Sequence, residues 1–159
     1  MDALLDLLNS RPLINGEERD ALGDPAGGRS WAREHGGEGS LAELALLRQA
    51  RDALRDVVRG DSPPAALRPL LEGVHQFPET TADGLQWTVE APPHARLAVE
   101  MVLAWDAAEK QLPGRLRPCA NDECRLFLLD RSRANRARWC SMAVCGNRAK
   151  ARRHYERTR

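Results

Sequence analysis

Four cysteines are the residues of this chain best suited to chemistry, and all of them lie after Gly114. They form two pairs, Cys119 with Cys124 and Cys140 with Cys145, each spaced C-x4-C, with 15 residues between the pairs. Two short-spaced pairs separated by a hairpin-length insert are typical of a tetrahedral zinc site with four thiolate ligands. We therefore expect these four side chains to hold one zinc ion.

The sequence leaves two other interpretations of these cysteines: two disulfides, or free thiols in a core. The chain opens on Met1 and Asp2 and no secretory leader follows, so we expect a cytoplasmic protein. Disulfides are rare in that reducing compartment, which favours zinc. Because four thiolates complete the tetrahedron and leave no place for an activated water, we expect a structural site. His154 is a spare candidate ligand.

The elements around the cysteines predict a small zinc finger. Turn-forming residues separate the first two thiols within 117–124, which predicts a knuckle. Residues 125–130 are typical of a short strand, with 137–140 as its expected partner and the basic loop 131–136 between them. A helix is expected from residue 141 onward, and its N-terminal dipole favours thiolates there. This order of knuckle, hairpin and helix resembles a treble-clef zinc finger.

Several positions of this segment resemble the CGNR zinc finger, a family named for the tetrapeptide at residues 145–148. The matching residues are Cys119, Cys124, Phe127, Asp130, Ser132, Arg138, Trp139, Cys140, Ser141, Met142 and 145–150. Residues 5–11, Trp31 and 44–58 look similar to the ABATE domain that precedes such fingers in bacterial proteins. The resemblance implies a stress-linked transcription regulator whose finger binds DNA.

The charge of the chain is strongly divided between its two parts. The formal net charge is only +1, but residues 1–114 carry 11 basic and 19 acidic side chains and residues 115–159 carry 13 basic and 4 acidic ones. The net charges are therefore −8 and +9. We interpret the two parts as an acidic ABATE-like domain (1–114) and a basic finger (115–159). Such asymmetry indicates a polyanionic partner, or a basic segment that folds back on the acidic part.

Basic side chains of the predicted loop and C-terminal helix are the candidate DNA contacts. They are Arg131, Arg133, Arg136, Arg138, Arg148, Lys150, Arg152, Arg153 and Arg157. Arginine reads phosphates and guanine edges, and an exposed basic helix fits the major groove. One or two arginines are expected to be structural instead, with Arg138 or Arg148 paired to Asp130 or to a carboxylate of the N-terminal part. Asn135 and Asn147 are candidates either for base contacts or for a turn and a helix cap.

The acidic part is expected to be mainly α-helical with one short β-hairpin. The apolar pattern predicts helices at 2–9 (with a turn-rich start as the alternative there), 41–58, 65–74 and 95–111, with a loop at 22–28 and a polar stretch at 15–21. Ser40 and Glu43 form a capping box before the second of these helices, and Gly60 ends it. Alternation at 85–90 predicts a strand, with 74–81 as its partner.

The chain contains no residue set typical of an enzyme. Its histidines outside the finger, His35, His75 and His94, fall in different predicted elements, and no phosphate-binding glycine loop occurs. No run of 18 apolar residues is present, so no membrane partner is expected. We expect a DNA-binding transcription regulator, not an enzyme, with a small-molecule or protein effector at the N-terminal domain. The alternative is a zinc-stabilised adaptor that binds protein; the oligomeric state stays open.

Overall fold

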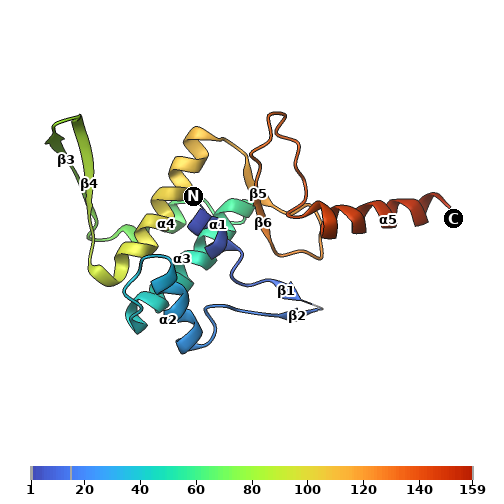
Figure 1. Cartoon of the computed structure of the whole chain (residues 1–159), viewed down its shortest axis with the longest axis horizontal. Helices are drawn as coiled ribbons and strands as arrows, with labels where there is room; N and C mark the ends of the chain where they lie inside the picture. Colours follow the sequence, from blue (N-terminus) through green and yellow to red (C-terminus); the bar gives the residue numbers. More distant parts are fainter. Residues whose placement is uncertain (1, 15, 159) are drawn as a thin grey trace.

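The computed structural model describes residues 2–14 and 16–158 and shows an elongated molecule with most of its helices gathered in the middle (Figure 1). The N-terminal part contains helices α1 (Asp2–Leu8), α2 (Pro25–Glu34), α3 (Leu41–Arg59) and α4 (Pro93–Gln111), and a 3-10 helix η1 (Pro64–Leu71). Its antiparallel hairpins are β1 (Leu13–Ile14) with β2 (Glu17–Glu18), and β3 (His75–Thr81) with β4 (Gly84–Glu90). The C-terminal part contains strands β5 (Leu116–Pro118) and β6 (Phe127–Leu129), a wide helical turn η2 (Met142–Gly146) and helix α5 (Asn147–Arg157).

This arrangement confirms the predicted fold class, a mainly helical part followed by a small finger. The helices expected at 41–58 and 95–111 are α3 and α4, and the expected hairpin is β3 paired with β4. A second hairpin, β1 with β2, was not predicted, because its strands have only two residues each and show no alternation. No helix within the described ranges has the length and apolar character that a membrane crossing needs.

Two helices of the N-terminal part differ from the prediction. Part of the loop expected at 22–28 is helical, because Asp24 accepts hydrogen bonds from the Ala26 and Gly27 amides and Pro25 occupies the first turn. The helix expected at 65–74 is instead the 3-10 helix η1. Pro69 lies inside it and has no N–H for an α-helical hydrogen bond.

Helix α3 runs through the centre of the molecule, and its sequence fixes both of its ends. The Ser40 hydroxyl accepts a hydrogen bond from the Glu43 amide at 3.1 Å, and Gly60 ends the helix with a φ of +82°. Only half of the predicted capping box forms. The Glu43 carboxylate accepts from the amides of Gly39, at 2.7 Å, and Glu38, at 3.2 Å, and not from Ser40. The buried carboxylate therefore holds the loop that precedes the helix.

A single apolar core joins the helices to the finger. Its buried side chains come from α1, α2, α3, η1 and α4, and include Leu4, Leu7, Leu8, Ala32, Leu44, Leu47, Leu54, Leu67, Leu97, Ala98 and Val102. Leu116 of β5 and Phe127 of β6 belong to the same cluster, at 5% and 1% exposure. The finger strands therefore bury their apolar side chains against the helices of the N-terminal part.

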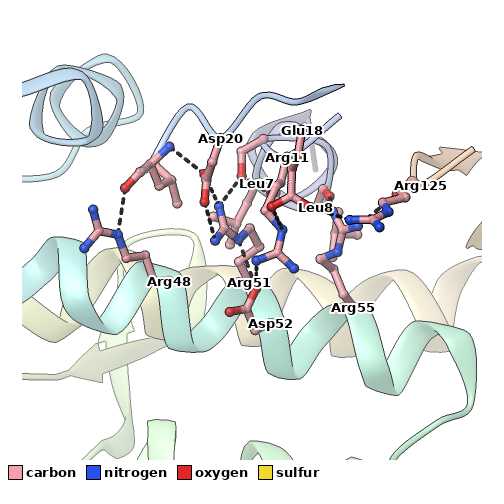
Figure 2. A network of polar contacts seen from close by, with 12 residues as sticks. Leu7, Leu8, Arg11, Glu18, Asp20, Arg48, Arg51, Asp52, Arg55 and Arg125 are labelled. Atoms are coloured by element: carbon pink, nitrogen blue, oxygen red, sulfur yellow. Dashed lines mark hydrogen bonds and ion pairs between the residues drawn. The ribbon is translucent and has the colours of Figure 1, made fainter. Parts of the chain in front are cut away.

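Arginines on one face of α3 hold the N-terminal segment in place (Figure 2). Arg51 is 2% exposed and donates to both oxygens of Asp20, at 2.5 Å and 3.0 Å, and to the Ser10 hydroxyl at 3.2 Å. Burial opposes ionisation of Asp20, but the hydrogen bonds from Arg51 and Leu22 outweigh it and lower its pKa. Asp52 adds a more exposed contact to Arg51 at 3.1 Å.

We expect Asp20→Asn to destabilise the protein by about 3 kcal/mol, because it leaves the buried Arg51 without its bidentate partner. The matched control is Asp52→Asn, which removes a half-exposed partner of the same arginine and costs under about 1 kcal/mol. Urea unfolding followed by circular dichroism measures both. Equal losses for the two variants would contradict the central role given to the Asp20 pair.

Candidate metal centre and nucleic-acid interface

The four cysteines converge on one point although they come from two separate stretches of chain. All four sulfur atoms lie within 4.8 Å of one another. The Cys124 and Cys140 sulfurs are 3.7 Å apart, as are those of Cys140 and Cys145. Four sulfurs about 2.3 Å from a tetrahedral zinc ion are separated by about 3.8 Å, whereas a disulfide needs about 2 Å. The four thiols are free and their arrangement fits one structural zinc ion.

A turn supplies each pair of sulfurs. The first pair lies in the connection between β5 and β6, which the Cys119 amide closes by donating to the Leu126 carbonyl at 2.8 Å. The Cys124 amide donates to the Asn121 carbonyl at 2.7 Å and tightens the knuckle. In the second pair Cys140 precedes η2 and Cys145 lies within it, and the Gly146 amide closes this wide turn by donating to the Ser141 carbonyl at 3.0 Å. Helix α5 then continues directly from the site.

Without a metal, the surroundings disfavour the thiolate form at Cys124 and Cys140. Burial raises the pKa of Cys124 to about 11. It raises the pKa of Cys140 further, and the neighbouring thiols add to the rise there. Two N–H groups are aimed at the other sulfurs: the Cys140 amide at Cys119, at 3.4 Å, and the Asn121 side chain at Cys145, at 3.6 Å. Four neighbouring thiolates repel one another unless a metal neutralises them, so the donor set suits Zn²⁺.

The strand partner predicted for β6 is wrong. Strand β6 pairs with β5, in the register Arg117 opposite Leu128, and not with residues 137–140. The backbone of the predicted partner is occupied elsewhere. The Ala137 amide donates to the Asp130 carboxylate at 2.8 Å, and the Ala137 carbonyl accepts from the Arg117 side chain at 3.1 Å. Side chains therefore close the basic loop where a second strand pair was expected.

Arg117 and Asp130 are the hub of that loop. Their side chains form an ion pair at 2.6 Å, and Asp130 is 2% exposed. Hydrogen bonds from Ser132, followed by those from Ala137 and the charge of Arg117, lower the pKa of Asp130 to about 2. Asp130 therefore has an arginine partner, as expected, but the partner is neither Arg138 nor Arg148. Arg117 also donates to Asn135, whose φ of +48° makes it a turn residue.

The nine predicted nucleic-acid-binding residues are all exposed, but three of them have contacts within the protein. Arg131 pairs with Asp2 of α1. Arg138 lies over the Trp139 ring at 5.4 Å. Arg152 lies 3.7 Å from Glu123 and 3.5 Å from Asn121, so its side chain holds α5 against the knuckle.

The other six basic side chains are not matched by carboxylates of the described residues at ion-pair distance. They are Arg133, Arg136, Arg148, Lys150, Arg153 and Arg157. No residue of α5 is buried, and the helix projects away from the rest of the molecule (Figure 1). On this helix Asn147 donates to the Ala143 carbonyl at 3.1 Å, which favours the cap role for it. His154 is not among the side chains grouped around the metal position.

A pair of hydrogen bonds from α1's C-terminal end fastens the finger to the helices. The Asn9 side chain accepts from the Phe127 amide at 2.7 Å and donates to the Phe127 carbonyl at 3.2 Å. One amide thus satisfies both backbone groups of a residue 118 positions away, at the strand that leaves the knuckle. No local sequence signal marks this role of Asn9 apart from its place in the 5–11 stretch.

Arg55 reinforces the same joint from α3 (Figure 2). Its guanidinium donates to the Leu8 carbonyl at 2.6 Å and to the Arg125 carbonyl at 3.0 Å, and it lies 5.2 Å from the centre of the Phe127 ring. Burial, followed by the charge of Arg59, lowers the pKa of Arg55 to about 10, so it stays charged at neutral pH. A buried cation therefore bridges α1 and the segment that follows Cys124.

Removal of zinc is expected to lower the stability of the whole folded protein and not only of the finger, because Leu116 and Phe127 belong to the core formed by the helices. A strong chelator should release one zinc ion and four reactive thiols per chain and lower the thermal unfolding midpoint. Metal analysis, thiol titration and calorimetry measure these quantities. Cys145→Ser should abolish tight zinc binding, while Ser141→Ala, which keeps the four thiols, should not. Thiols that react fully before chelation would contradict the site.

Asn9→Ala is expected to cost about 1–3 kcal/mol, because it leaves the Phe127 amide without its partner. Zinc affinity, measured by competition with a chelator, should fall with it. Asn9→Asp keeps the acceptor and loses the donor, so it should be intermediate. Gln49→Ala on the exposed face of α3 is the control and should lie within about 0.5 kcal/mol of wild type. Reduced stability with unchanged zinc affinity would show that the hydrogen bonds between Asn9 and Phe127 do not support the metal site.

Two models of known protein families match the chain. Residues 115–158 match the model of the CGNR zinc finger. Residues 2–112 match the ABATE model, whose description is "Putative stress-induced transcription regulator". A search of curated proteins gives no match. The position of an independent domain boundary after residue 114 stays a prediction. Because the ABATE model covers most of its length and the finger model covers the remainder, the chain belongs to the family of ABATE-domain proteins with a CGNR zinc finger.

Proposed function

We propose that this protein is a DNA-binding transcription regulator whose zinc-stabilised finger binds duplex DNA. The observation that carries the proposal is the group of six exposed basic side chains on α5 and the loop before it, which no described carboxylate neutralises. An uncompensated basic surface of this kind is what a phosphate backbone attracts. The family description as a transcription regulator supports the same conclusion.

The shape of α5 suits the major groove. Its 11 residues extend about 16 Å. An α-helix with its side chains is narrow enough to enter a major groove about 12 Å wide. Lys150, Arg153 and Arg157 are spaced i, i+3 and i+7, so they form one ridge along the helix. Arg148 lies on the opposite side with Tyr155, which is 72% exposed. The helix thus offers cations to both walls of a groove.

The loop before the metal site adds a second contact region. Arg133 and Arg136 stand on a loop that the Arg117–Asp130 pair holds closed. We propose that these two side chains bind phosphates, while Arg152 positions α5 and does not contact DNA. In this scheme zinc has no catalytic part and the protein is not an enzyme; it works in the cytoplasm, where its thiols stay reduced.

The N-terminal part receives the signal in this proposed function. An apolar groove between η1 and α4, lined in part by Leu67, Leu71, Val102 and Trp105, is the candidate place for an effector. The Asn9 and Arg55 contacts join α1 and α3 to the finger. A ligand whose binding shifts these helices would therefore also displace the residues around the metal site. The effector in this scheme is a small apolar molecule or a protein segment.

A protein-binding adaptor is the second candidate, because apolar side chains are also exposed around the metal site. Met142 and Val144 are 55% and 50% exposed and lie on η2, next to the basic helix. Such a mixed surface also suits an acidic protein partner with an apolar anchor. The adaptor binds no DNA, so one experiment separates the two functions.

The triple variant Lys150→Ala, Arg153→Ala and Arg157→Ala should bind duplex DNA more weakly than wild type. The salt dependence of its log affinity should be shallower by about 2.7, or about 0.9 for each lost phosphate contact. The control is Arg68→Ala, Arg96→Ala and Lys110→Ala, which removes the same charge from the N-terminal part. Fluorescence anisotropy over a salt series measures both. A zinc-loaded wild type that ignores DNA at low salt would favour the adaptor.

A further inference from the structure

The β3–β4 hairpin is an arm that leaves the helical core and stands in solvent (Figure 1). Its strands have seven residues each and pair with one another from His75 opposite Glu90 to Thr81 opposite Gly84. Every residue of β3 is exposed, and none of β4 is buried. A lone two-stranded hairpin is at best marginally stable in water, so an arm of this length needs a further contact surface.

One face of the arm is apolar. In the observed register Pro78 lies opposite Trp87, and Leu85 and Val89 occupy the same face two residues on either side of Trp87. Leu85 is 63% exposed and Trp87 is 57% exposed. The other face is mostly polar, and Phe77, at 38% exposure, is its one large apolar side chain. Nothing in the described residues covers the face that carries Trp87.

The two edges of the arm are protected to different degrees. The β3 edge carries Pro78, which has no N–H to offer, and the charged Glu79. Proline and charge are the usual devices that keep an edge strand from pairing with another chain. Strand β4 carries no proline, and its only charge is at its last residue, Glu90. The edge left open for pairing is therefore that of β4.

We propose that the arm is a dimerisation element in which β4 pairs antiparallel with β4 of a second copy about a two-fold axis at Trp87. This register sets Trp87 opposite its own copy and Leu85 opposite Val89, all on the apolar face. Gly84 then lies opposite Glu90, so no two carboxylates face each other directly. The result is a four-stranded sheet with the proline-bearing β3 strands at both outer edges.

A second copy fits this edge better than an unrelated protein does, because the sequence of β4 is complementary to itself in that register. Aromatic and aliphatic cross-strand pairs stabilise a sheet, and an isologous contact uses the same patch twice. The arm carries Glu79, Asp83 and Glu90 and no lysine or arginine. In the proposed pairing Glu79 is on the outer strand and Asp83 at the tip, away from the two-fold axis.

The position of the arm is consistent with the proposed function and deepens it. The arm and α5 lie at opposite ends of the molecule (Figure 1), so pairing through β4 leaves both fingers free. Two fingers related by a two-fold axis match two half-sites on DNA. This last step rests on the proposed function, whereas the dimer itself does not. Two paired strands of seven residues, each about 23 Å long, bury less surface than the roughly 1,600 Å² of a standard interface, so the dimer should be weak.

Sedimentation of the full zinc-loaded chain without DNA, from about 1 μM to about 1 mM, tests the proposal over the range of weak interfaces. Wild type should pass from monomer to dimer. Trp87→Thr should weaken dimerisation at least tenfold, while the control Phe77→Thr, on the opposite face, should dimerise like wild type. A wild type that is monomeric throughout, or two variants with equal dissociation constants, would overturn the proposal.

Hydrogen exchange distinguishes a variant that has lost dimerisation from one in which the arm has unfolded locally. In wild type, protection of the β4 amides should rise with protein concentration, while protection of the outer β3 amides should not. Protection that rises on β3 alone, or on neither strand, would overturn the β4 pairing. The variant lacking Lys150, Arg153 and Arg157 separates the two proposals, because it should dimerise like wild type. Dimerisation of a wild type that ignores DNA would leave the dimer standing and remove the DNA function.

Discussion

The contact on which the finger depends is the seating of Phe127 in the helical core. Phe127 begins the strand that leaves the first pair of metal-binding thiols, and it is 1% exposed. The Asn9 amide satisfies its backbone and the Arg55 guanidinium lies over its ring. A segment of this size has little core of its own, so zinc and the helices together supply what a larger domain buries by itself.

This joint explains how a basic finger coexists with an acidic N-terminal part. Among the described residues two ion pairs cross between them, Arg131 with Asp2 and Arg125 with Glu18. The helix that follows the metal site points away, and apart from Arg152 its described basic side chains have no carboxylate at ion-pair distance. The near-zero net charge of the chain thus conceals a surface that is polarised along its length, which suits a polyanion at one end.

Much of the site was predictable because its signals are local. The spacing of the four cysteines indicates that they are metal ligands. Ser40 and Gly60 define the ends of α3 because they are favourable capping residues. The partner of β6 was not predictable in this way. The predicted partner had suitable residues, but Asp130 and Arg117 occupy its backbone groups, and such competition between side chains and a strand ladder appears only when the chain is folded.

The sequence by itself determined the metal ligands, the helical core elements and the division of charge, because spacing, periodicity and composition act over a few residues or over a whole segment. Only the tertiary structure decided which cations are free, which arginine partners Asp130, and that Asn9 holds a strand 118 residues away. It also decided that β3 and β4 stand apart from the core. These features depend on long-range packing, and no local pattern records which distant groups will meet.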